Sequence, residues 1–209
     1  MNPMTKTHCI ASGLIGLLAL PPAPALADTD HAPSVLAGAR LGGIAPFDGL
    51  SPFVSGGIEV GYITPALQHR LAIVLDVDYT QPTTTGSESD PRVMGGTYTW
   101  KLTEQELGVM PAVVYRLTGL GSIVPYAGLG PRLLLARSTV RDNGMPAIGD
   151  THEQSTRLGL GIPVGAELAA GPGRVTGELL VQYGTLNHVA TGDANTAAMS
   201  LAVGYRLIF

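Results

Sequence analysis

The last thirteen residues, Ala197 to Phe209, alternate strictly between two kinds of side chain. Large apolar side chains occupy every second position: Met199, Leu201, Val203, Tyr205, Leu207 and Phe209. The positions between them hold small residues, one isoleucine and a single arginine, Arg206. Because successive side chains of a β-strand point to opposite faces, this segment predicts a strand with one continuous apolar face and one small or polar face.

The same period of two recurs along the chain and predicts eight strands. They cover residues 34–45, 53–63, 70–80, 105–117, 124–138, 155–169, 174–184 and 197–209. Eight is the smallest usual number of strands for a membrane barrel, and 28 glycines with 16 prolines suit one turn-rich domain. The predicted fold is all-β: an eight-stranded antiparallel up-and-down transmembrane β-barrel formed by residues 28–209.

The predicted connections alternate in length and character. Those at 64–69, 118–123 and 170–173 are short, whereas 81–96, 139–154 and 185–196 are long and polar. Barrels of this kind have short periplasmic turns and longer external loops. We therefore expect the long segments to be exposed loops on the outside of the cell.

The N-terminal segment has the features of a secretory leader. Lys6 precedes an apolar run from Ile10 to Leu20, and Ala25-Leu26-Ala27 fits the small-residue site of a signal peptidase. The run is shorter than the roughly 20 apolar residues of a spanning helix. We predict a signal peptide over residues 1–27, cleaved after Ala27. Cys9, the only cysteine, would leave with it, so no disulfide or Cys-based metal site is expected.

Charged residues share the small-residue face of the predicted strands. They are Arg40, Glu59, Asp76, Asp78, Glu106, Arg116, Arg132, Arg157, Glu167, Glu178 and Arg206. An arginine that faces lipid at the midplane costs roughly 2–4 kcal/mol, so these residues must face the lumen if the barrel spans a membrane. The nearly balanced charges predict a structural ion-pair network, in which Arg206 and Glu178 are expected to meet.

A soluble barrel with the opposite orientation has the same alternation, with the aliphatic face inside. Two features favour the membrane barrel. The polar face is rich in glycine and arginine, with Lys101 the only lysine after the leader, which suits a narrow lumen. The aliphatic face also carries tyrosines near strand ends, as interfacial aromatic belts do: Tyr62, Tyr79, Tyr115, Tyr183 and Tyr205.

Two features fit a regular barrel poorly. Pro111, Pro131 and Pro163 fall inside predicted strands, where each removes a backbone donor, and bulges are expected to accommodate them. The apolar residues of 98–102, which include Trp100, have the parity of the lumen face. Either a bulge intervenes before Leu107, or this segment extends the strand beyond the membrane.

The terminal strand, with its apolar face and final Phe209, resembles the closing strand of Gram-negative outer-membrane barrels, which acts as an assembly signal. The residues that carry this resemblance are Leu201, Val203, Tyr205, Leu207 and Phe209. Residues 28–209 as a whole resemble the small eight-stranded family typified by the OmpA transmembrane domain and OmpX. The expected chain end at Phe209 leaves no room for the peptidoglycan-binding domain of OmpA-type proteins.

The resemblance implies an outer-membrane monomer with a side-chain-filled, ion-paired lumen. Its implied partners are outer-membrane lipid and lipopolysaccharide, the outer-membrane assembly machinery and periplasmic chaperones. It also implies a structural or surface-interaction role, with a weakly conducting small pore and a lipid-modifying enzyme as alternatives. The acidic balance without a basic cluster argues against nucleic-acid binding.

The sequence provides no catalytic, cofactor or metal site. His152, Glu153 and Ser155 fall within a predicted loop, too close in sequence to infer a fixed base and nucleophile, and His188 near Asp193 matches no lipid-hydrolase motif. Asp142-Asn143-Gly144 predicts a tight turn rather than a calcium site. We therefore expect no enzymatic activity.

Overall fold

The computed structural model describes residues 34–47, 50–145, 151–185 and 196–209. The strands are β1 (Ser34–Pro46), β2 (Phe53–Ile63), β3 (Leu71–Thr80), β4 (Thr83–Ser89), β5 (Thr97–Arg116), β6 (Ile123–Asp142), β7 (Thr151–Ala170), β8 (Gly173–Gly184) and β9 (Ala198–Ile208). The predicted signal peptide lies outside these residues. Within them, no helix is long and apolar enough to cross a membrane.

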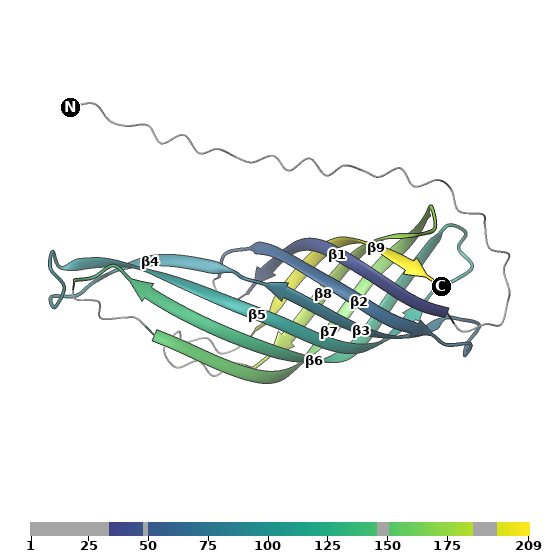
Figure 1. Cartoon of the computed structure of the whole chain (residues 1–209), viewed down its shortest axis with the longest axis horizontal. Coiled ribbons are helices and arrows are strands. Elements are labelled where there is room, and N and C mark those ends of the chain that lie inside the picture. Colours follow the sequence, from purple (N-terminus) through teal and green to yellow (C-terminus); the bar gives the residue numbers. More distant parts are fainter. Residues whose placement is uncertain (1–33, 48–49, 146–150, 186–195) are drawn as a thin grey trace, which may run out of the picture.

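The strands form a closed antiparallel barrel (Figure 1). Consecutive strands pair with each other, except for β3 and β4, which both pair with β5. β1 pairs with β9, and this pairing closes the cylinder. β3 and β4 keep one register against β5, and the Glu104 amide donates to the Pro82 carbonyl between them at 3.0 Å. They are therefore two parts of one strand interrupted at Pro82, and the predicted eight-stranded up-and-down barrel is confirmed.

The two faces of the wall are oriented as the membrane barrel requires. The aliphatic side chains lie on the outside, and so do the five tyrosines near strand ends. The charged positions on the opposite face are mostly buried. The soluble orientation, with the aliphatic face inside, is wrong for this chain. The terminal strand joins the seam as β9, and Phe209 and Val35 exchange backbone hydrogen bonds of 2.8 and 3.1 Å.

Three strands are much longer than a membrane requires. β5, β6 and β7 each contain 20 residues, or about 66 Å of extended chain, whereas a spanning strand needs about 9–11 residues. Figure 1 shows β4 and the adjoining ends of β5 and β6 projecting past the other strands. The expected loops at 81–96 and 139–154 are therefore wrong in part, because β4 takes residues 83–89 of the first, and β6 and β7 take residues 139–142 and 151–154 of the second. Threonine-rich sequence of this kind can continue a β-ladder.

The segment around Trp100 belongs to this projection. The side-chain alternation of β5 is unbroken from Thr97 to Arg116, and its pairing with β4 and β3 shows no slip. The indole of Trp100 covers Gly86 on the neighbouring strand, where a β-carbon would collide with the ring. Of the two alternatives that the sequence left open, the bulge is therefore wrong, and the strand instead extends past the end of β3.

The prolines are accommodated without bulges, contrary to expectation. The β5–β6 pairing stops at Val109↔Leu133 and resumes at Val113↔Leu129 in the same register. That register places Pro111 opposite Pro131, so two missing donors fall in one gap of the ladder. Pro163 falls in a second gap, where the β6–β7 pairing stops at Ala127↔Val164 and resumes at Gly130↔Gly161, again without a change of register.

Candidate functional site

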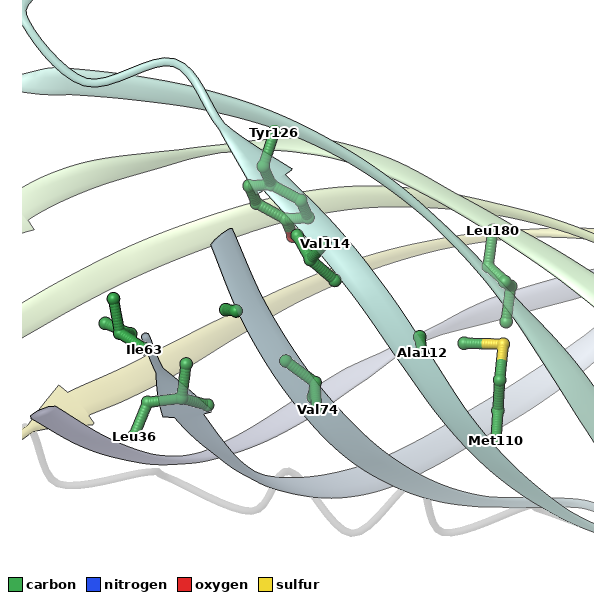
Figure 2. Packing of buried hydrophobic residues seen from close by; sticks show 9 residues of the cluster. Leu36, Ile63, Val74, Met110, Ala112, Val114, Tyr126 and Leu180 are labelled. Atoms are coloured by element: carbon green, nitrogen blue, oxygen red, sulfur yellow. The ribbon is translucent and has the colours of Figure 1, made fainter. Parts of the chain in front are cut away.

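The lumen of the barrel is the candidate site, because the charged residues singled out in the sequence converge there. Apolar side chains from several strands fill much of it: Leu36, Ile63, Ala72, Val74, Met110, Ala112, Val114, Tyr126 and Leu180. Figure 2 shows these side chains pointing toward one another between the strands. Two groups of ion pairs pack among them.

The first group, here called the mid-barrel cluster, contains Arg40, Asp76, Asp78, Arg132 and Glu178. Both terminal nitrogens of Arg40 donate hydrogen bonds to the carboxylate of Asp76. Arg40 Nη1 also donates to Glu178 Oε1 at 3.0 Å. Nη2 of Arg132 donates to Asp78 Oδ1 at 2.5 Å. Bidentate contacts of this kind fix the planar guanidinium in one orientation, so the cluster ties β1, β3, β6 and β8 together across the lumen.

The second group, the short-turn cluster, lies nearer the short turns and contains Glu59, Arg116, Glu167, Arg174 and Arg206. Arg206 makes two hydrogen bonds of 2.6 Å to the carboxylate of Glu59 and a third bond to Glu167. Arg116 Nη2 donates to Glu167 at 2.6 Å, and Arg174 Nε lies 3.6 Å from the same carboxylate. Glu167 is completely buried, so it depends on these cations for its charge to be tolerated.

Tyr126 joins the two clusters. Its hydroxyl donates to Glu178 Oε2 at 2.9 Å, and its ring centroid lies 5.2 Å from the guanidinium carbon of Arg206. Neither Tyr126 nor Arg174 was among the predicted lumenal residues. Both have the inward parity of their strands, the same as Arg132 and Glu178 respectively, so the alternation alone contains the signal that identifies them.

Two other predicted lumenal residues belong to neither cluster, and only Glu106 is buried as expected. Glu106 is buried on β5, opposite Thr80 and Ala136. Arg157 has the inward parity of β7 but is exposed, and it makes no ion pair within the described residues. The described pairing of β7 with β8 ends at Gly159↔Gly184, so no described residue of β8 lies opposite Arg157.

The expected contact between Arg206 and Glu178 is wrong. In the β8–β9 register Glu178 lies opposite Ala202, and Arg206 lies opposite Arg174. Counting residues inward from the strand ends placed the two side chains at equal depth. Strands of a barrel are staggered against each other, so equal counts do not correspond to equal depth.

The space left between the two clusters is very small. A hollow of about 10 Å³ remains, bounded by residues that include Glu59, Asp76, Met110, Tyr126 and Arg206. One water molecule needs about 10–15 Å³ of such volume. This hollow therefore has room for at most a single water molecule.

The other candidate residues form no catalytic constellation in the described part of the chain. His152 and Ser155 fall on opposite faces of β7, and His152 Nδ1 lies 3.2 Å from Thr139 Oγ1. Gly144 donates its amide to Asp142 Oδ1 at 2.9 Å, which is a local turn bond. No group of three or more His, Cys, Asp or Glu side chains is placed to hold a metal among the described residues. His188 and Asp193 lie outside them.

Comparison with known proteins gives the fold but no closer relationship. No family model matches the chain, and no curated protein does. Among solved structures, the chain resembles a major outer membrane protein from Thermus thermophilus, with a TM-score of 0.56, 16% identity and coverage of 86% of this chain and 100% of that one. It is also similar to Neisserial surface protein A, with a TM-score of 0.49, 22% identity and coverage of 85% and 97%.

OprG from Pseudomonas aeruginosa, an outer membrane protein, has a TM-score of 0.47 and 12% identity, over 86% of this chain and 97% of its own. At these sequence identities the similarity indicates a shared fold and says nothing about a shared function. The chain has the fold of the small eight-stranded outer-membrane barrels, as its sequence predicted.

Proposed function

We propose that this chain is an outer-membrane surface protein that displays a polar β-sheet outside the cell on a sealed barrel. The observation that carries the proposal is the length of β5, β6 and β7, each 20 residues. About half of each strand suffices to cross a bilayer. The remainder forms a paired sheet, and an interaction site built on strands is held more precisely than a site built on loops.

The direction of the projection follows from the topology. β1 begins and β9 ends at the end of the barrel that has the short turns, as Figure 1 shows. In barrels of this type the short turns are periplasmic. The β4–β5–β6–β7 projection is then external.

A conducting pore has less support from the described residues. The mid-barrel cluster, the short-turn cluster and the apolar side chains between them leave a hollow of only about 10 Å³. A hydrated ion needs a continuous water-filled path, which a lumen packed to this degree does not provide. The lumenal arginines held by carboxylates serve instead to keep the wall in one register.

Thiol labelling on intact cells tests the proposed topology. The variant Met94→Cys places a thiol at the β4–β5 tip, where the native side chain is 82% exposed. The variant Leu120→Cys places a thiol in the short β5–β6 turn, where the native side chain is 64% exposed. We expect a membrane-impermeant maleimide to label only the first variant on intact cells. The second variant should react only after the outer membrane is permeabilised.

The unmodified chain is the matched control, because its only cysteine, Cys9, lies in the predicted leader. Labelling of Leu120→Cys but not Met94→Cys on intact cells would mean that the barrel is inverted. Recovery of the protein in the soluble periplasmic fraction would refute the membrane location itself.

A further inference from the structure

The projecting sheet has two faces of opposite electrostatic character. Its inner face carries acidic residues: Glu88, Glu104, Glu106, Asp142 and Glu153. The outer face, continuous with the lipid-facing side of the barrel, carries Lys101, Arg137 and Arg141. Across the described outward positions of β4 to β7 above the aliphatic belt there is no acid, so this outer face is basic.

Two of these cations are placed directly against each other. Lys101 on β5 is the cross-strand partner of Arg141 on β6, and both are exposed on the same face. Like charges in directly opposed positions destabilise an antiparallel pair. None of Lys101, Arg137 and Arg141 makes an ion pair with a carboxylate within the described residues. The arrangement is therefore unfavourable for the protein alone and becomes favourable when an anion lies between the cations.

A polar hollow lies at the same place. It has a volume of about 280 Å³ and is lined by Gln81, Lys101, Thr103, Gln105, Thr139 and Arg141. Two cations beside two amides and two hydroxyls offer donors for phosphate oxygens and partners for sugar hydroxyls. The lining suits a phosphorylated sugar better than an apolar ligand.

The height of the cations above the membrane narrows the choice of ligand. Arg137 lies two residues beyond the aliphatic Leu135, and Lys101 lies six residues beyond Leu107. At about 3.4 Å per residue and a tilt of about 40°, these offsets correspond to roughly 5 and 15 Å above the apolar belt. A phospholipid headgroup layer is only about 5–8 Å thick. A simple phospholipid thus reaches Arg137 but falls short of the Lys101–Arg141 pair.

We propose that Lys101, Arg137 and Arg141 bind the phosphorylated sugar headgroup of an outer-leaflet glycolipid, whose acyl chains lie against the aliphatic face of β5 and β6. Arg137 takes the deeper part of the headgroup, and the Lys101–Arg141 pair binds a phosphate held higher on the sugar. The inference rests on the proposed function in one respect, namely that the projecting sheet lies on the outer side of the membrane. The binding of the headgroup depends only on the side chains on the outer face of the sheet.

A fluorescent dye on the outer face provides a direct probe. Thr99 lies two residues from Lys101 on the same face of β5 and, together with Lys101 and Arg141, lines a second hollow of about 520 Å³. We would attach an environment-sensitive dye to Thr99→Cys, place the protein in phosphatidylcholine nanodiscs and follow the dye fluorescence as bisphosphorylated lipid A is introduced. Parallel series would use phosphatidylglycerol at equal charge and soluble inorganic phosphate.

We expect saturable binding of lipid A at a mole fraction at least tenfold below that needed for phosphatidylglycerol. The double variant Lys101→Gln with Arg141→Gln should need at least tenfold more lipid A, whereas Arg92→Gln, which removes an exposed arginine elsewhere, should bind as the parent does. Raising the salt concentration should weaken binding by the parent and change little in the double variant.

A measurement of stability distinguishes a binding role of Lys101 and Arg141 from a structural role. In phosphatidylcholine alone the double variant should be at least as resistant to urea as the parent, because the cross-strand repulsion is gone. Equal response of the parent to lipid A and phosphatidylglycerol, equal response to inorganic phosphate, or unchanged lipid A binding by the double variant would each overturn the inference. Because nanodiscs give the lipid access to both sides, these outcomes are independent of the thiol-labelling result on cells.

Discussion

Arg206→Ala is expected to lower the free energy of unfolding by about 3–5 kcal/mol. Its guanidinium is the only described ion-pair partner of Glu59, and it also holds the completely buried Glu167. Truncation leaves a carboxylate inside the barrel without its counter-charge, which costs far more than the loss of an exposed pair. Urea unfolding in lipid vesicles, followed by the gel shift between folded and unfolded barrel, measures the change.

Arg92→Ala is the matched control, because it breaks the exposed Asp90–Arg92 pair at the β4–β5 tip and should leave stability almost unchanged. A double-mutant cycle then tests the register. Arg206→Met combined with Glu59→Leu should recover much of the single-variant loss. Strictly additive losses would show that these two side chains do not meet.

Gly42→Val is expected to prevent closure of the barrel. Gly42 faces β9 at the β1–β9 seam, and a β-carbon there would overlap the Leu201 carbonyl oxygen and lie 2.6 Å from the Ala202 α-carbon. Both are backbone atoms, so no side chain can rotate away. We expect a loss of at least about 3 kcal/mol, at the upper end of overpacking effects, visible as a low yield of the folded gel species.

Gly177→Val is the comparison for this variant. A β-carbon at Gly177 on β8 meets no atom within 4 Å, and valine favours strands, so folding should be unchanged or improved. If both variants fold with equal yield, the close approach at the seam is not as described.

The faces of the strands could be predicted because alternation reports directly which residues share a side. That is why the inward positions of Arg40, Arg116 and Glu167, and the outward tyrosines, follow from the sequence. Alternation also places Tyr126 and Arg174 on the inward face of their strands, where each contacts a lumenal carboxylate.

The depth of each side chain along the barrel axis and the length of β5, β6 and β7 could not be predicted from alternation. A period of two is unchanged when a strand slides by two residues, so the partners of Arg206 depend on barrel stagger that the sequence does not contain. The polar ends of β5, β6 and β7 have few buried aliphatic side chains, such as Leu102, and their polar and charged residues do not form the aliphatic alternation that marks the membrane-facing part of each strand. Only cross-strand pairing, such as Thr83 with Thr103, shows that they are strands. The exposure of Arg157 likewise does not follow from its inward parity, because it lies beyond the described pairing of β7 with β8.

Single-channel recording tests the central claim, a barrel sealed by its own side chains, most directly. With the purified, refolded protein in planar phosphatidylcholine bilayers, we predict no discrete current steps above the baseline, because the hollow between the two clusters is about 10 Å³. A known porin inserted under the same conditions is the positive control. Reproducible, ohmic current steps that scale with the amount of folded protein would contradict the account.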